Sequence, residues 1–314
     1  MVPRAQFAPS SSYYGRPVIK APSWAARDIA GYFFLGGLAG AGSVLAAGAQ
    51  LTGRGRTAKG MKVSSLTAIA LSTAALVHDL GRPSRFPHML RVLKPTSPMS
   101  VGSWLLAAYG PAAGAAAGCA VTGLLPVAGA AATAGAALLG PAVASYTAVL
   151  AADTAVPAWH GAHRELPYLF TASATAAACG MALVLGPVRE NAPARHAAVL
   201  AAGAEAAAHR AVERRLGMVA ETCREGRAGT LLRAARLLTA AGAATAALMG
   251  RRSRTAAVAG GLALLAGSAC TRFGVFAAGI ASAEDPKYTV VPQRAGRTSD
   301  GGRAPDADPG RGRP

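Results

Sequence analysis

Residues 33–49, FFLGGLAGAGSVLAAGA, form a run without a single charged side chain. Polar sequence precedes this run up to Asp28, and basic sequence follows it from Arg54. A helix of about 20 apolar residues is long enough to cross the roughly 30 Å hydrocarbon core of a bilayer. The run therefore predicts a membrane-spanning helix, and similar runs recur along the chain.

The composition extends this prediction to the whole chain. Of its 314 residues, 52% are hydrophobic and only 15% are charged, whereas soluble domains carry about 25% charged residues. We predict an all-α polytopic membrane helix bundle with about eight transmembrane helices. Their expected ranges are 28–51, 61–80, 100–125, 131–157, 166–187, 195–214, 231–249 and 256–281. A surface-lying amphipathic helix stays an alternative for the sixth range, which contains Glu205, His209 and Arg210.

The expected domains are an N-terminal surface segment at 1–27, a transmembrane domain at 28–282 and a disordered tail at 283–314. The net charge is +18, but the basic residues lie mostly beside apolar runs. There they meet membrane lipids, which argues against nucleic acid as the partner. More Lys and Arg residues lie in the segments on the side of the membrane that carries both termini than on the other side. We therefore expect a multi-pass protein of the cell (inner or cytoplasmic) membrane, with both termini in the cytoplasm.

Small residues predict where the helices touch. Gly36 and Gly40 lie four residues apart in the first range, and Gly110, Gly114 and Gly118 repeat this spacing in the third. Such spacing lets helix backbones approach closely. We expect both glycine faces to pack against neighbouring helices.

The connector HDLGRPSRFPHMLRVLKPTSPMSVGS, residues 78–103, joins the second and third predicted helices. Its prolines make it a stiff, shaped surface loop. Its cations are expected to receive an acidic face of a partner protein. The docking candidates are Arg82, Arg85, Arg91 and Lys94. Helix capping by His78 and Asp79, with lipid phosphates on the cations, is the alternative.

Several segments resemble the NrfD/polysulfide reductase membrane subunit family. They are YYGRPVIKAPSW (13–24), the run at 33–49, HDLGRPSRF (78–86), KPTSPMSVGSW (94–104) and YTAVLAADTAVPAWHGAHRELP (146–167). The resemblance implies a quinone-reactive membrane anchor of a molybdopterin oxidoreductase complex, which is not catalytic alone. It implies electron exchange with a four-cluster ferredoxin-like iron–sulfur subunit, which relays electrons to the molybdopterin catalytic subunit.

The same resemblance implies what the chain binds. Menaquinone or ubiquinone is the expected diffusible substrate, with no bound heme, metal or iron–sulfur cluster in this chain. The quinone pocket is expected near the membrane face that meets the iron–sulfur partner, between the first and fourth helices. Tyr146 matches the quinone-contacting tyrosine of the family.

Phenols and carboxylates in the predicted helices are candidates for quinone chemistry. Asp28 and Tyr32 share a helix face four residues apart, and Tyr146 and Asp153 share another seven residues apart. A phenol can hydrogen-bond a quinone carbonyl, and a nearby carboxylate can pass protons. We expect catalytic roles for these four residues, and quinone binding by Tyr32, Tyr146 and His78. A place in the interfacial aromatic belt is the alternative for Tyr32.

Ionisable side chains inside a span are costly and indicate function or pairing. Glu205 and His209 lie four residues apart and could form a short proton relay, and Arg272 could neutralise Glu205. We add Asp79, at the end of the second helix, to this relay. A single buried ion pair without a proton-transfer role is the alternative.

Two other functions remain open. A b-type cytochrome anchor needs histidine pairs on facing helices as heme ligands, and only His78 and His209 approach the helix interiors. A secondary transporter needs broken helices at matched positions of two halves. The cysteines are scattered singly, which argues against an iron–sulfur cluster in this chain; they are Cys119, Cys179, Cys223 and Cys270.

Overall fold

The computed structural model describes residues 19, 22, 24–79 and 88–291 of the chain. Within these residues the fold is all-helical, as predicted. The α-helices are α1 (Ala26–Leu51), α2 (Gly55–Asp79), α3 (Pro98–Thr122), α4 (Pro126–Ala152), α5 (Pro157–Gly161), α6 (Leu166–Leu185), α7 (Ala192–Leu216), α8 (Glu221–Arg224), α9 (Gly226–Leu248) and α10 (Arg254–Glu284).

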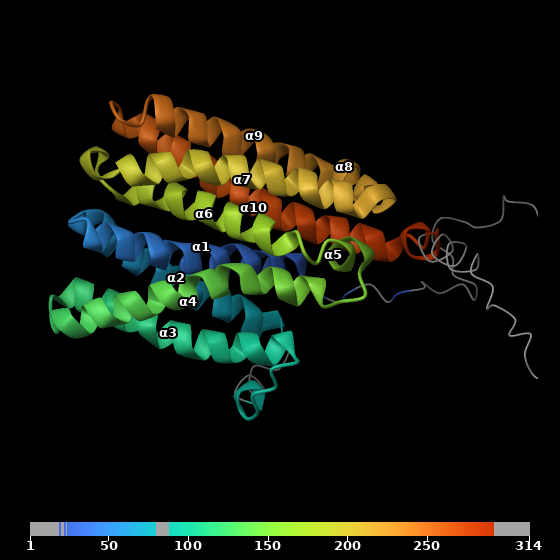
Figure 1. Cartoon of the computed structure of the whole chain (residues 1–314), viewed down its shortest axis with the longest axis horizontal. Coiled ribbons are helices and arrows are strands. Elements are labelled where there is room, and N and C mark those ends of the chain that lie inside the picture. Colours follow the sequence, from blue (N-terminus) through green and yellow to red (C-terminus); the bar gives the residue numbers. More distant parts are fainter. Residues whose placement is uncertain (1–18, 20–21, 23, 80–87, 292–314) are drawn as a thin grey trace, which may run out of the picture.

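Seven helices of the described chain are long and apolar enough to cross a membrane. They are α1, α2, α3, α4, α6, α9 and α10. Helix α7 has 25 residues but falls outside this set, because charged side chains interrupt its apolar surface. It runs alongside α6 and α9 instead of lying across the end of the bundle (Figure 1). The predicted polytopic helix bundle is confirmed, and α7 is its most polar long helix.

The long helices form two groups that pack side by side (Figure 1). Helices α1–α4 make the first group, and α6, α7, α9 and α10 make the second. Helix α1 joins the groups, because it also contacts α6 and α10. Successive long helices alternate in direction, so that α1 begins and α10 ends at the same end of the bundle. We call this the terminal end; α5 and the described part of the α2–α3 connector, residues 88–97, also lie there.

Small residues let α1 pack closely against its neighbours. A Cβ added at Gly40 would overlap the carbonyl oxygen of Gly140 in α4, so the two backbones touch there. The close contacts predicted for Gly36 and Gly40 are confirmed. On α3 the prediction is wrong for Gly110 and Gly118, since a Cβ added at either would meet nothing within 4 Å, whereas one at Gly114 would make an ordinary contact with Leu66 of α2 at 3.9 Å. Gly110 and Gly118 lie on an open surface of α3.

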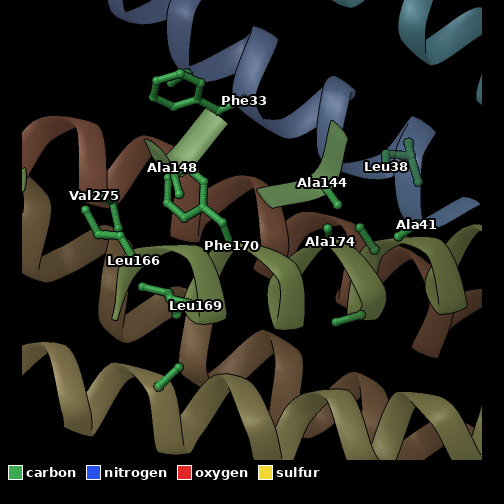
Figure 2. Packing of buried hydrophobic residues seen from close by; sticks show 14 of the residues in the cluster. Phe33, Leu38, Ala41, Ala144, Ala148, Leu166, Leu169, Phe170, Ala174 and Val275 are labelled. Carbon is green, nitrogen blue, oxygen red and sulfur yellow. The ribbon is translucent and has the colours of Figure 1, made fainter. Parts of the chain in front are cut away.

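Aromatic side chains fill the junction between the two groups. The rings of Phe33 in α1 and Phe170 in α6 have centroids 5.7 Å apart. Figure 2 shows them beside Ala148 of α4, in a core built largely of alanine and leucine. Trp159 of α5 is buried and donates its indole N–H to the carbonyl oxygen of Val275 at 2.8 Å. The short helix α5 is thereby fastened to α10.

The chain stays ordered beyond α10. Residues 287–291 are helical, and Tyr288 is buried. Lys287 donates a hydrogen bond to the carboxylate of Glu221 in α8 at 2.6 Å, which lowers the pKa of that carboxyl. The tail predicted from residue 283 therefore begins with residues that pack on the bundle, and residues 292–314 lie outside the described part.

Candidate functional site

Acidic and basic groups meet at the terminal end, where α1 begins and α2 ends. Nδ1 of His78 lies 2.9 Å from Oδ2 of Asp28. The His78 side chain is 78% exposed, whereas that of Asp28 is 17% exposed. Asp79 accepts a hydrogen bond from the backbone N–H of Ala25 at 3.1 Å. An exposed histidine thus contacts a partly buried carboxylate at this end, and Asp79 stabilises the start of α1.

Tyr32 of α1 and Tyr146 of α4 lie at the interface of these two helices, farther from the terminal end than Asp28. Their side chains lie near each other where α1 packs against α4. Each tyrosine lies six residues from the terminal end of its helix, which corresponds to about 9 Å along the axis. Tyr32 is enclosed with 1% of its surface exposed, whereas Tyr146 is partly exposed. Two residues predicted to bind quinone therefore form one site.

The ring of Tyr146 lies directly against Gly102 of α3. A Cβ added at Gly102 would overlap Cζ and the hydroxyl oxygen of Tyr146. Only glycine leaves room for the tyrosine ring at this level. Sequence reasoning missed Gly102, because nothing in its local sequence indicates a contact with a residue of α4.

Further polar groups surround the tyrosine pair. Ser72 of α2 donates a hydrogen bond to the backbone carbonyl of Tyr32 at 3.1 Å. Oγ1 of Thr147 is buried and has no hydrogen-bond partner among the described residues. A Cβ added at Gly36 would lie 3.3 Å from Oγ of Ser72 and 3.8 Å from Cγ2 of Thr147. Ser72 and Thr147 thus lie on either side of Gly36, one helical turn from Tyr32.

Buried polar side chains continue through the first group toward its opposite end. The hydroxyls of Tyr109 and Ser43 lie 2.6 Å apart, and Lys62 donates a hydrogen bond to Gln50. Between these pairs is a cavity of about 10 Å³, which is room for about one water molecule. Its polar lining residues are Ser43, Lys62, Ser65 and Thr133. These groups can hold water and protons where a membrane otherwise excludes charge.

The other predicted relay residues lie in the second group, away from the tyrosine pair. Oε1 of Glu205 accepts a hydrogen bond from Thr271 at 2.6 Å, and its Oε2 has no partner among the described residues. Nε2 of His209 is also unpartnered. Arg272 donates to the carbonyl of Phe170 and lies 3.9 Å above that ring. The described residues contain no direct Glu205–His209 hydrogen bond and no Glu205–Arg272 contact at ion-pair distance, although the charges of Glu205 and Arg272 lie close enough to interact. Neutralisation of Glu205 by Arg272 stays a prediction. A proton-transfer role for these residues stays a prediction.

Asp153 lies outside the span in which it was predicted. Helix α4 begins at Pro126 and ends at Ala152, five residues before the predicted end. Asp153 follows it directly and is exposed at the terminal end. Its carboxylate is thus a surface group at the same end of the bundle as the His78–Asp28 pair.

The connector before α3 carries the predicted docking cations. Arg91 and Lys94 are exposed, and Val92 and Leu93 between them are 70% and 57% exposed. Ser100 holds the bend, because it accepts from the Lys94 N–H and donates to the Val92 carbonyl, both at 3.0 Å. Exposed apolar side chains framed by cations are typical of a protein-binding surface. Two predicted cations lie outside the described residues: Arg82 and Arg85.

Comparison with known protein families bears on the first group of helices. The family model described as polysulphide reductase, NrfD, matches residues 22–114. The matched region contains α1, α2 and most of α3. It includes Asp28, Tyr32, His78 and Gly102, and it ends before Tyr146. The resemblance noted in the sequence is confirmed over this range. No curated protein matches the chain.

Proposed function

We propose that this chain is the quinone-reactive membrane subunit of a multi-subunit oxidoreductase. It exchanges electrons between the membrane quinone pool and an iron–sulfur partner subunit. The observation that carries the proposal is the Tyr32–Tyr146 pair, about 9 Å inside the terminal end. The His78–Asp28 contact lies one helical turn closer to that end, at the surface. The match of residues 22–114 to the NrfD family model supports the same assignment.

Quinone chemistry needs hydrogen bonds and protons at this site. Reduction of a quinone to a quinol consumes two electrons and two protons, and oxidation releases them. The partly exposed Tyr146 donates a hydrogen bond to a quinone carbonyl, while the enclosed Tyr32 orients Tyr146 from behind. Asp28 and His78 exchange the protons with solvent. Asp153 is a further surface acid at this end.

The electrons pass through a partner that docks at the terminal end. A four-cluster ferredoxin-like subunit on the α2–α3 connector would lie at the same end of the bundle as the tyrosine pair. A molybdopterin catalytic subunit then completes the complex. The excess of Lys and Arg at the terminal end favours its placement on the cytoplasmic side of the cell membrane.

The b-type cytochrome alternative finds less support in the geometry. His78 is exposed at the terminal end and contacts Asp28, whereas His209 is buried in the second group. The two histidines therefore do not face each other across one interface, as axial ligands of one heme must.

A photoactivatable quinone analogue tests the location of the site. On the purified protein in lipid nanodiscs, we expect cross-links in the peptides that contain Tyr32, Gly102 and Tyr146, because these residues meet at one place. Mass spectrometry of the digested protein identifies the labelled peptides. Excess menaquinone should suppress the labelling at least tenfold. Labelling confined to α7, α9 or α10 would contradict the proposal.

Charge reversal in the connector tests partner docking. The double variant Arg91→Glu, Lys94→Glu should reduce co-purification of the iron–sulfur subunit at least tenfold, because it places repulsive charge opposite an acidic surface. Quantitative mass spectrometry of the affinity-purified complex measures this ratio. The matched control is Arg251→Glu, Arg252→Glu, since these exposed cations lie at the opposite end of the bundle. Equal recovery of the partner with both double variants would remove docking from the connector.

A further inference from the structure

A groove of about 1000 Å³ opens on the outer surface of the second group, between α6 and α7. Its α7 wall extends from Ala197 to Ala211 and consists of alanines and one leucine. These 15 positions correspond to about 21 Å of helix. One leaflet contributes about 15 Å to the hydrocarbon core. The groove therefore has the apolar lining and the length to receive an acyl chain.

Charged groups of both signs lie where the groove reaches the terminal end. Glu165 lines the groove, and its Oε2 is buried without a hydrogen-bond partner among the described residues. Arg215 follows Ala211 by four residues, so it continues the groove face of α7 and is exposed. A Cβ added at Gly161 would lie 3.0 Å from Cδ2 of Leu216. This contact holds the end of α7 against α5, which precedes Glu165 and α6 in the chain. Because α6 and α7 also pack along each other in opposite directions, Arg215 and Glu165 lie at the same end of the bundle.

Arg215 and Glu165 together favour a ligand that carries one negative and one positive charge. The guanidinium of Arg215 is suited to a phosphate, to which it can donate two hydrogen bonds. Because Glu165 lines the groove, its carboxylate is suited to a ligand that carries a positively charged N–H donor. Phosphatidylethanolamine carries a phosphate and, two carbons away, an ammonium group. Phosphatidylcholine has the same phosphate but no N–H to donate.

We propose that the α6–α7 groove binds one phosphatidylethanolamine molecule. An acyl chain lies along the alanine wall, the phosphate contacts Arg215, and the ammonium group donates to Glu165. A bound lipid would stabilise α7 in the bilayer, because α7 is the long helix that lacks a continuous apolar run. A bound lipid covers its alanine face and ties it to the bilayer. This inference does not use the Tyr32–Tyr146 pair, although Ser145 of α4, the neighbour of Tyr146 in the chain, also lines the groove.

Native mass spectrometry of the purified full-length protein tests the lipid site. With equal amounts of phosphatidylethanolamine and phosphatidylcholine of the same acyl chains, we expect one ethanolamine lipid to be retained at least tenfold more often. This comparison uses the wild-type protein and does not depend on the folding of any variant. Equal retention of the two lipids would overturn the proposal. It would leave the groove to an acyl chain of any lipid or to a transmembrane helix of a partner.

Two variants separate the headgroup contacts. Glu165→Gln should reduce the preference for phosphatidylethanolamine over phosphatidylglycerol at least fivefold, because the amide offers no negative charge to the ammonium group. Arg215→Gln should lower the retention of both lipids at least tenfold. Arg252→Gln is the matched control, since it removes an exposed arginine at the opposite end of the bundle. Retention that is the same in all three variants would overturn the assignment of these residues.

Discussion

Gly102→Ala is expected to lower the quinone-linked turnover of the assembled complex by roughly 10²-fold, the range of a lost proton-transfer or positioning group. The added methyl group would occupy the space of Cζ and the hydroxyl oxygen of Tyr146. The tyrosine ring must move, and its hydroxyl leaves the position beside Tyr32. We also expect a loss of roughly 1–3 kcal/mol in the free energy of unfolding, the usual range for overpacking a helix interface.

Gly110→Ala is the matched control for this prediction. It lies in the same helix, but a Cβ added there would meet nothing within 4 Å. Glycine is less favourable than alanine inside a helix by roughly 0.5–1 kcal/mol, so this variant should be as stable as the wild type or more stable. Turnover should not change. Equal turnover of Gly102→Ala and Gly110→Ala would show that the position of Tyr146 does not matter for the reaction.

Tyr146→Phe is expected to lower the same turnover by roughly 10²-fold. Phenylalanine keeps the ring in its place against Gly102 and removes only the hydroxyl, which lies near Tyr32 and which we propose contacts the quinone. The amount of assembled complex should therefore stay unchanged, which gel filtration and partner stoichiometry can verify. The double variant Gly102→Ala, Tyr146→Phe should turn over no more than tenfold slower than Tyr146→Phe alone, because both changes act on one hydroxyl.

Tyr288→Phe is the matched control for the loss of a tyrosine hydroxyl. Its hydroxyl lies 3.4 Å from Glu221 at the end of the second group, away from the tyrosine pair. We expect wild-type turnover for this variant. Unchanged turnover in Tyr146→Phe as well would remove Tyr146 from the site.

The long helices could be predicted from the sequence, because an uncharged run such as residues 33–49 has few alternatives in a membrane. The ends were harder to predict. Helix α4 begins at Pro126, a favourable residue for a first helical turn, and not at residue 131. The same helix ends at Ala152 and not at residue 157, so Asp153 lies just outside it. Apolar sequence identifies a span, but local capping decides where the span stops.

The contacts between helices could be predicted only in part. The four-residue spacing of Gly36 and Gly40 and that of Gly110 and Gly114 look alike in the sequence, yet only the first pair faces a close neighbour. The spacing says which residues permit contact, not where the neighbouring helix lies. Glu205 and His209 are a similar case. They share a helix face but do not bond each other, because Glu205 accepts its hydrogen bond from Thr271 of α10.

The site itself combines predicted and unpredicted elements. Helical spacing and the family resemblance identified Asp28, Tyr32 and Tyr146 one by one. Their assembly depends on α1 and α4 meeting in the first group, and no local pattern encodes that meeting. Gly102 could not be predicted, because its role is to leave space for a neighbour. That role is recognised only from the structure, in which the ring of Tyr146 fills this space.

The central claim is that the Tyr146 hydroxyl contacts a quinone bound by this chain. Its most direct test is the dissociation constant of a short-chain menaquinone analogue, measured on the purified chain alone in lipid nanodiscs. The account predicts saturable binding by the wild type and about tenfold weaker binding by Tyr146→Phe, which corresponds to about 1.4 kcal/mol for the lost hydrogen bond. Absence of saturable binding by the wild type, or the same dissociation constant for both proteins, would contradict it.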